Sequence, residues 1–338
     1  METQKIKTAV VVLNWNGKAW LEKFLPTLVK HSHIATVFVA DNASTDHSID
    51  FVENSFPSVR IIENAKNGGY AKGYNDALKQ IDAEYFVLIN SDIEVTEGWL
   101  YPVIDLMDSD KKIAACQPKL LDYKKRNTFE YAGASGGFID KLGYPFCRGR
   151  IFDDIEQDNG QYNDAIEVFW ATGACLFIRA SCFNEIGGLD EDFFAHQEEI
   201  DLCWRLKNSG YKIMVQPKSV VYHVGGGTLG VGSPFKTHLN FRNNLFMLFK
   251  NLPTTYLFIN IPARLVLDGL AALTFLNKEK GLQHVLAIAK AHFIFYFEIP
   301  KLIAKRRKIK QKNNLVGKVD WSILLKNKIK GINRFSEL

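Results

Sequence analysis

The sequence YFVLINSDIEV, Tyr85–Val95, places an aspartate directly after a run of strand-forming residues. The apolar run Tyr85–Ile89 is typical of a buried strand, and Asn90, Ser91 and Asp92 follow it. Open α/β sheets bind their ligands at this end of a strand. A carboxylate there can hold a divalent cation, which in turn can hold a diphosphate. The same three residues are also common in turns, so taken alone they favour a simple turn over a metal site.

Ahead of this stretch, strand patterns alternate with helix patterns. The predicted strands are Thr8–Leu13, Thr36–Ala40 and Val59–Ile62, and the predicted helices are Leu21–Leu28, Ser48–Asn54 and Tyr74–Ile81. This alternation predicts a parallel sheet with right-handed crossovers, in which the carboxyl ends of the strands share one edge. Polar turns follow three strands, at Asn14–Gly17, Asp41–Asp46 and Asn90–Asp92, and a nucleotide could lie across the edge that they form.

The segment NAKNGGYAKG, Asn64–Gly73, has glycines that let a backbone approach a ligand closely. It does not match the G-x-G-x-x-G pattern of dinucleotide-binding proteins, and it lacks the G-K-[ST] of a P-loop. The dinucleotide-binding and NTPase interpretations are therefore disfavoured.

The next part of the chain carries an acidic cluster and a histidine. Its predicted elements are helices at Trp99–Met107 and Ala180–Ile186, an extended segment at Ile113–Leu121, hairpins or a mobile loop over the site at Tyr123–Asn163, and strand, turn and strand at Val168–Arg179. In Leu189–Tyr211 an apolar helical face places Glu198, Glu199 and Asp201 near the helix N-terminus, where the helix dipole favours carboxylates without any catalytic role. His223 ends the strand Ile213–Tyr222, ahead of a turn formed by three glycines.

The composition predicts a globular chain with two differently charged parts. Its 338 residues, 47% apolar and 23% charged, suit one α/β domain with a C-terminal extension and a packed core. Residues 1–240 hold 24 Lys and Arg against 32 Asp and Glu, a net charge of −8, whereas residues 241–338 hold 18 against 5, a net charge of +13. We therefore expect the two parts to face different partners.

The cysteines and the N-terminus favour a cytoplasmic chain. Five cysteines lie without a C-x-x-C pair or zinc-like spacing, as is typical of reduced thiols. The first apolar run, Ala9–Leu13, is short and no small-residue cleavage site follows it, so no secretory signal is expected.

Taken together, the motifs resemble those of the family 2 glycosyltransferases, the inverting nucleotide-sugar transferases of GT-A fold, and especially bacterial rhamnosyltransferases and related enzymes of cell-surface polysaccharide synthesis. The motifs are VVVLNWNG at 10–17, DNASTD at 41–46, NGGYAKGYNDAL at 67–78, INSD at 89–92, ATGACLFIR at 171–179, GGLDEDFFAHQEEIDLCWRLKNSGY at 187–211 and HVGGGT at 223–228. Each motif is weak alone, but the ordered set, spanning roughly residues 5–230, is specific.

The resemblance implies a GT-A, Rossmann-like fold, with a mostly parallel sheet flanked by helices and a C-terminal helical extension. It implies a catalytic domain at residues 1–240 that takes a sugar from a nucleotide donor, such as dTDP-rhamnose or a UDP-sugar. Asp41 would contact the nucleotide base or ribose, and Asn14, Asn67 and Gly69 would help to form the same pocket. The sugar and acceptor side would be lined by Trp170, Thr172 and Gly173, although Trp170 could equally be a core aromatic.

The resemblance also implies a metal ligand and a catalytic base. Asp92 matches the last residue of the family's D-x-D element and would bind Mg²⁺ or Mn²⁺ on the donor diphosphate, while Asn90 replaces the first acid. His223 resembles a further ligand, although a lone histidine at a strand end is weak evidence. The base is usually the Asp of a Glu-Asp pair, which here reads Glu198, Glu199. The matching residue is Glu199, Glu198 remains an alternative, and either would deprotonate an acceptor hydroxyl.

The C-terminal part, residues 241–338, is basic and rich in apolar helix patterns. Charged residues interrupt its apolar runs, so no stretch reaches about 18 uncharged apolar residues and a spanning helix is not expected. The cluster KLIAKRRKIKQK, Lys301–Lys312, favours peripheral attachment to an anionic membrane at its cytoplasmic face. The alternative is a helical subdomain packed on the catalytic domain. No nucleic-acid recognition module accompanies the charge.

Two functions remain open at this point. The first is a metal-dependent glycosyltransferase that acts on a glycan or lipid-linked acceptor. The second is a non-catalytic nucleotide-sugar-binding or scaffold protein of the same fold, an alternative raised by Asn90 and by the Glu198–Glu199 pair. A nucleotidyltransferase is disfavoured, because Asn14–Leu21 is not a basic glycine-rich loop.

Overall fold

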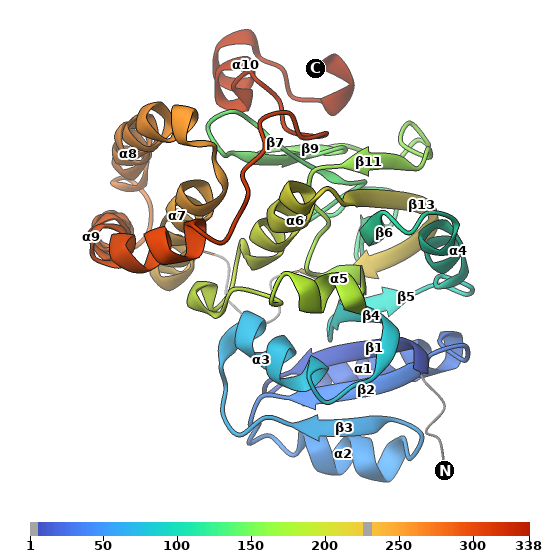
Figure 1. Ribbon diagram of the computed structural model, residues 1–338. Coiled ribbons are helices and arrows are strands. Elements are labelled where there is room, and N and C mark those ends of the chain that lie inside the picture. The colour runs from blue at the N-terminus through green and yellow to red at the C-terminus, as the bar shows by residue number, and fades with distance from the viewer. Residues whose placement is uncertain (1–5, 226–231) are drawn as a thin grey trace.

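The computed structural model describes residues 6–225 and 232–338 and is built on a mixed, nine-stranded sheet (Figure 1). The strand order is β11-β13-β6-β12-β4-β1-β2-β3, and β5 pairs with β13. The strands of this sheet are β1 (Ile6–Asn14), β2 (Thr36–Asp41), β3 (Arg60–Glu63), β4 (Ala83–Asn90), β5 (Ile93–Val95), β6 (Ile113–Asp122), β11 (Ile166–Val168), β12 (Cys175–Arg179) and β13 (Lys212–His223).

The N-terminal half of the sheet is parallel, with helices on both faces. Strands β3, β2, β1 and β4 pair in parallel, connected by α1 (Lys18–His31), α2 (Ser48–Ser55) and α3 (Gly69–Leu78). Alternate side chains of β1 point to opposite faces, so that Val10 and Val12 share a core with α1 while Ala9 and Val11 share a core with α3. The predicted alternation of strands and helices is confirmed.

The other half of the sheet departs from a parallel arrangement. Strand β12 lies between β4 and β6 and is antiparallel to both, and β11 and β5 are antiparallel to β13. These strands are reached through loops rather than through crossover helices, which allows the reversed direction. The predicted α/β fold, with parallel strands flanked by helices, is therefore confirmed, with four antiparallel pairings added in this half.

A second, smaller sheet forms within the segment predicted as hairpins or a loop. Its four antiparallel strands are β7 (Gly137–Ile139), β8 (Pro145–Cys147), β9 (Arg150–Ile151) and β10 (Asp154–Ile155). The C-terminal segment packs on it: Ile139 bridges to Lys318, and Ile323 is buried against Phe146 and Ile151.

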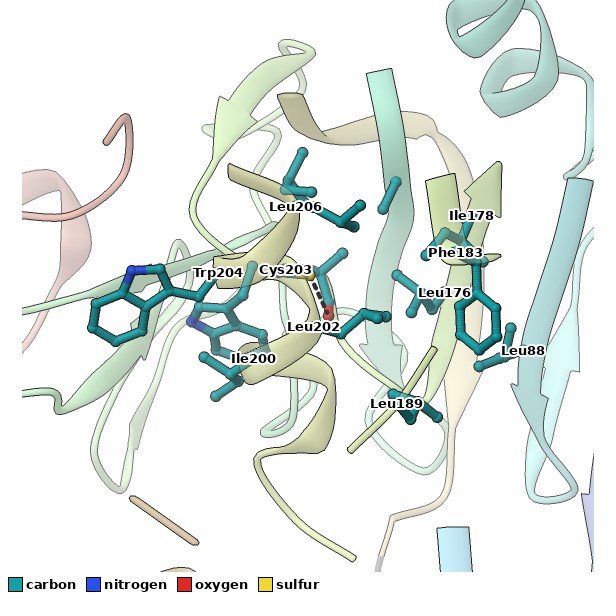
Figure 2. Close-up of a cluster of buried hydrophobic side chains, with 14 of the residues drawn as sticks. Leu88, Leu176, Ile178, Phe183, Leu189, Ile200, Leu202, Cys203, Trp204 and Leu206 are labelled. Carbon is teal, nitrogen blue, oxygen red and sulfur yellow. Dashed lines mark hydrogen bonds between the residues drawn. The ribbon is translucent and has the colours of Figure 1, made fainter. Parts of the chain in front are cut away.

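Three helices complete the domain around the sheet: α4 (Tyr101–Ser109), α5 (Ala180–Glu185) and α6 (Glu198–Ser209). The apolar face of α6 packs toward the sheet, where Leu202 and Leu206 share a buried cluster with Leu176 of β12 and Leu88 of β4 (Figure 2). This packing fixes the position of α6, and its first residues are the two predicted catalytic glutamates.

The C-terminal helices pack beside α6. They are α7 (Pro234–Asn251), α8 (Thr254–Phe275), α9 (Gly281–Arg306) and α10 (Ile323–Lys330). Helix α7 lies between α6 and the pair α8 and α9, and the predicted domain boundary at residues 240 and 241 falls inside it (Figure 1). By length and composition α8 could cross a membrane, because only two charged residues, Arg264 and Asp268, interrupt its apolar sequence. The sequence analysis did not expect a spanning helix here, because it required an apolar stretch without charges. These two residues are buried and paired with each other at 2.9 Å.

Candidate functional site

A cavity of about 530 Å³ opens at the carboxyl ends of the central strands. Its walls come from the turns after β1, β2 and β4, from the turn before β12, and from the end of β13. Because β12 is antiparallel, its amino end lies at the same edge of the sheet as the carboxyl ends of its neighbours. The predicted edge thus exists, and it has a cavity where the sequence predicts a nucleotide.

The turns after β1 and β2 are held together behind the cavity wall. Asn14 donates to Asp41 at 2.9 Å, and the Asn42 amide donates to the Asn14 carbonyl at 2.8 Å. Both Asn14 and Asp41 are buried, and neither lines the cavity, whereas Asn42 does. Ser44 donates to Asp41 at 2.5 Å through its hydroxyl. The structure therefore places Asn14 and Asp41 as supports of the turns.

The glycine-rich segment lies against the loop that precedes α6. Gly69 adopts φ +76°, and a Cβ there would lie 2.5 Å from the Phe194 carbonyl oxygen. The Asn67 side chain accepts a hydrogen bond from the Gly69 amide at 2.9 Å, and the hydroxyl of Tyr70 donates to the Gly173 carbonyl at 2.6 Å. Asn67, Gly69 and Gly173 all line the cavity, and their contact with a donor stays a prediction.

Trp170 lies apart from the cavity. Its side chain is buried, its indole N–H donates to the Phe138 carbonyl at 2.9 Å, and its ring covers Gly137. Trp170 is therefore a core aromatic, which is the alternative that the sequence analysis left open.

The predicted metal residues meet at one wall of the cavity. Nε2 of His223 lies 3.1 Å from Asp92, and Nδ1 lies 3.1 Å from Glu130. Burial alone would lower the pKa of His223, but the carboxylates of Glu130 and Asp92 outweigh it and raise the pKa to about 10. Without a metal, the imidazole is therefore a cation between two carboxylates.

This wall can supply part of a metal site. Asp92 and His223 both line the cavity, and they offer a carboxylate oxygen and an imidazole nitrogen, which are usual ligands of divalent cations. Among the described residues, no group of three or more His, Cys, Asp or Glu could hold a metal alone. The two residues therefore fit a cation that takes its remaining ligands from a bound diphosphate or from water.

The two glutamates at the start of α6 differ in their surroundings. Burial raises the pKa of Glu199 to about 7, and this half-buried side chain lines the cavity. Glu198 also lines the cavity but is 4% exposed, and burial and the neighbouring Glu199 raise its pKa well above the usual range. At neutral pH Glu199 is thus partly ionised, whereas burial and the neighbouring Glu199 disfavour the ionised form of Glu198.

Asp201 faces away from the cavity, into an ion-pair cluster. It accepts from Arg205 at 2.8 Å and lies 2.9 Å from Lys250. Although burial opposes ionisation, Lys250 and Arg205 keep the pKa of Asp201 below its usual value. It serves to attach α6 to α7.

Several cavity residues were not predicted from the sequence. They include Trp20, Tyr70, Ala132, Phe194, Ala195, His196, Phe235 and Lys236, whereas Trp15, Asn16 and Asn42 belong to the turns predicted at the nucleotide edge. Four of the unpredicted residues lie in loops and four in helices, and the sequence pattern gives no direction for their side chains. Trp15 was indicated by the sequence only as part of the turn after the first predicted strand. Of the predicted glycine turn after His223, residues 226 and 227 lie outside the described residues.

The sheet with its ligand edge, the cavity at that edge and the carboxylates that line it form the arrangement that the resemblance to GT-A glycosyltransferases predicts. The family profile "Glycosyl transferase family 2" matches residues 9–187, and the chain belongs to this family. The resemblance drawn from the motifs is thereby confirmed.

Relatives of known activity include bacterial rhamnosyltransferases. The N-acetylglucosaminyl-diphospho-decaprenol L-rhamnosyltransferase of Mycobacterium tuberculosis is 25% identical over 269 residues, covering 74% of this chain and 83% of the relative. The rhamnosyltransferase WbbL of Escherichia coli is 23% identical, covering 63% of this chain and 82% of the relative.

Solved structures share the fold. GalNAc-T7 with UDP, GalNAc and Mn²⁺ matches with a TM-score of 0.59 and 14% identity, covering 89% of this chain and 58% of that chain. S. aureus TarS 1-349 in complex with UDP-GlcNAc matches with a TM-score of 0.56 and 16% identity, covering 90% of each chain.

Proposed function

We propose that this glycosyltransferase transfers a sugar, with inversion, from a nucleotide-sugar donor to a glycan or lipid-linked acceptor in cell-surface polysaccharide synthesis. The proposal rests on the cavity itself, in which Glu199 faces the same space as Asp92 and His223. The donor is dTDP-rhamnose or a UDP-sugar, and the similarity to two rhamnosyltransferases, one of them named for N-acetylglucosaminyl-diphospho-decaprenol, supports the former.

Glu199 is the proposed base. Its pKa of about 7 leaves it partly ionised at neutral pH, so it can accept the proton of the acceptor hydroxyl as that oxygen attacks the anomeric carbon. The nucleoside diphosphate leaves from the opposite face, so a single displacement inverts the anomeric centre. Asn67, Gly69 and Gly173 line the space for the donor, and Asn14 and Asp41 hold the turns behind it.

The donor diphosphate would be bound with Mg²⁺ or Mn²⁺, held by Asp92 and His223. When bound, such a cation neutralises the charge that develops on the leaving diphosphate. The solved structure with UDP and Mn²⁺ supports this use of a metal. His223 must lose its proton to bind the cation, and Glu130 and Asp92, which stabilise the protonated form, make metal binding depend on pH.

The function is tested by a screen of nucleotide-sugars, read out as release of the nucleoside diphosphate with and without Mn²⁺. Glu199→Gln should abolish turnover and leave donor binding intact, while Glu198→Gln should keep most of the turnover. Asp92→Ala should abolish the response to metal. Full turnover in both glutamate variants, or in Asp92→Ala, would refute these assignments, and binding without turnover across a broad acceptor panel would favour the non-catalytic alternative.

The chain is further proposed to contact an anionic membrane through α8 and α9. Large apolar side chains are exposed along both helices, including Phe258, Val266 and Leu270 on α8 and Phe293 and Phe297 on α9. Helix α8 buries its charged pair, Arg264 and Asp268, toward the protein, so its outer face is apolar. Such a face, flanked by exposed lysines, is typical of helices that lie in a membrane interface.

A further inference from the structure

The loop that leads into the two glutamates has an unfavourable backbone. Phe194, His196 and Gln197 all adopt positive φ, at 63°, 72° and 71°. With ψ −61° and a 2.7 Å hydrogen bond from the Ala195 amide to the Phe193 carbonyl, Phe194 forms the rare, strained γ-turn. Such conformations are sparsely populated and persist only where the surrounding structure keeps them, so contacts around this loop, residues 193–197, must hold it in place.

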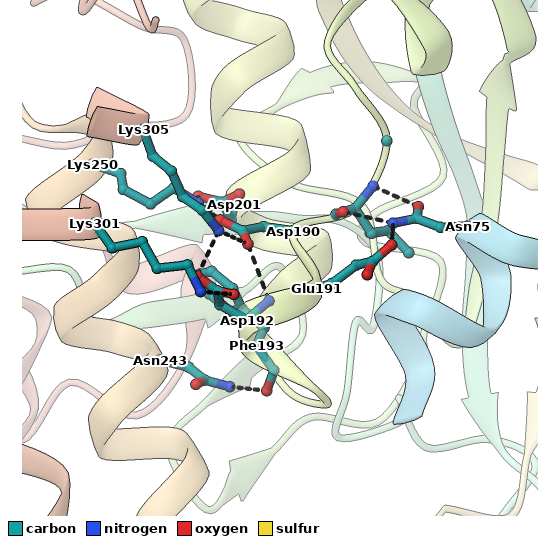
Figure 3. Close-up of polar contacts among 12 residues, drawn as sticks. Asn75, Asp190, Glu191, Asp192, Phe193, Asp201, Asn243, Lys250, Lys301 and Lys305 are labelled. Carbon is teal, nitrogen blue, oxygen red and sulfur yellow. Dashed lines mark hydrogen bonds and ion pairs between the residues drawn. The ribbon is translucent and has the colours of Figure 1, made fainter. Parts of the chain in front are cut away.

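Side chains of three consecutive residues of α7 form hydrogen bonds with this loop. The Asn243 amide donates to the carbonyls of Phe193, Ala195 and His196 at 3.0, 2.9 and 2.7 Å. We call Arg242, Asn243 and Asn244 the α7 latch. Figure 3 shows Asn243 reaching from its helix to Phe193.

The other two members of the α7 latch hold the two ends of the loop. Arg242 donates to the carbonyls of Asp192 and Phe193 at 2.9 and 3.0 Å. Asn244 donates to the Gln197 side chain at 3.1 Å. The whole loop is thus fixed from α7, an element that lies beyond the motifs of the family.

The loop also contacts the donor side of the cavity. The Phe194 carbonyl accepts a hydrogen bond from the Tyr70 amide at 2.7 Å. The same oxygen would lie only 2.5 Å from a Cβ on Gly69, so the loop and the glycine-rich turn are in close contact. The α7 latch therefore fixes a segment that touches the glycine-rich turn at one end and carries Glu198 and Glu199 at the other. Arg242, Asn243 and Asn244 themselves do not line the cavity.

We propose that Arg242 and Asn243 are positioning residues for the catalytic glutamates and act through residues 193–197. Asn243 is fully buried, and its amide meets three carbonyls that no helix or strand pairs. Without it the strained loop would relax, and the carboxylate of Glu199 would leave its place in the cavity. The inference rests on the proposed function, because it assigns the loop a role in that reaction.

The test compares Asn243→Ala and Arg242→Ala with a control, Asn240→Ala, which removes an amide from the same helix that makes no hydrogen bond with any described residue. In both test variants kcat should fall roughly 10- to 100-fold, with the donor KM changed less than about twofold. Hydrogen exchange of the amides in residues 193–199 should accelerate, and Asn240→Ala should match the wild type. Arg242→Lys, which keeps a donor, should recover part of kcat.

Hydrogen exchange separates this inference from the proposed function, since it needs no turnover. Absence of turnover in the wild type would refute the function while exchange still reports on the loop. Unchanged exchange in both variants would overturn the inference, and so would faster exchange with unchanged kcat. If Asn243→Ala does not fold, as judged by its melting temperature, the half-buried Arg242→Ala decides the outcome.

Discussion

At the scale of single residues, Glu199 owes its proposed role to its burial. A carboxyl whose pKa is raised to about 7 serves as a base only when it has lost its proton. We therefore expect kcat to fall about tenfold for each pH unit below 7, and to level off above it. The pH–rate profile at saturating donor measures this, and an apparent pKa near 4.5 would contradict the assignment.

Glu198 should instead affect stability. Its pKa is raised on folding, so the folded state binds a proton that the unfolded state has lost above about pH 4.5. This contribution to stability is complete below pH 4.5 and is lost as the pH rises toward the folded-state pKa. Glu198→Gln cannot ionise, so its melting temperature should exceed that of the wild type at pH 8 and approach it at pH 5. An equal difference at both pH values would contradict this.

The sequence located His223 and the acidic residues that line the cavity but could not assign their contacts. Asp92 and His223 were found from motifs. Glu130, which contacts His223, was not found, because it lies in an irregular segment whose apolar residues follow no helical or strand spacing. Asn14 and Asp41 were found as well, but the hydrogen bond between them, which holds them behind the cavity wall, depends on tertiary structure. Sequence patterns thus identify the chemistry of a site sooner than the direction of its side chains.

At the scale of elements, α6, α7 and α9 are joined by an ion network. Lys250 of α7 contacts both Asp190 and Asp201, and Lys305 of α9 contacts Asp190 and Asp192 (Figure 3). The pKa of Asp190 is well below its usual value, because Lys250 and Lys305 outweigh the effect of burial. Lys305, which belongs to the basic cluster expected to face a membrane, is therefore engaged inside the protein.

Lys250→Met should be strongly destabilising. The lysine is 1% exposed, and its removal leaves the buried Asp201 and Asp190 with fewer partners, at a cost of about 3–5 kcal/mol. Lys301→Ala is the matched control, since its pair with Asp192 is exposed and costs about 0–1 kcal/mol. Urea denaturation measures both values, and equal losses would contradict the role of burial.

The regular elements were predictable, and the irregular ones were not. Strands β1 to β4 follow apolar runs that any parallel sheet requires, whereas β5 has three residues and is defined only by its pairing with β13. The positive φ values at Phe194, His196 and Gln197 are imposed by α7 and have no local signal.

At the scale of the whole molecule, the basic C-terminal part has two faces. Its inner face holds the loop ahead of the catalytic glutamates through α7, and its outer face is the exposed apolar side of α8 and α9, at the edge of the molecule away from the sheet (Figure 1). The start of α9 lies beside the start of α7, where Thr237 and His284 are 2.8 Å apart, and Phe235 and Lys236 nearby line the cavity. The exposed face thus begins close to the cavity, which agrees with the proposal of a lipid-linked acceptor.

The last prediction concerns this outer face. Leu286, Phe293 and Phe297 are 60%, 62% and 69% exposed and lie on one side of α9. Each phenylalanine fully buried in an interface contributes about 1.5–3 kcal/mol, so replacing all three residues with serine should weaken binding to anionic liposomes at least about 100-fold. Liposome flotation with and without phosphatidylglycerol measures this. The control replaces Lys308 and Lys310 with serine, which should weaken binding less and mainly at low salt. Unchanged flotation of the triple variant would refute the membrane contact. If the triple variant sediments as a smaller species than the wild type in the absence of lipid, the face instead contacts a second copy of the chain.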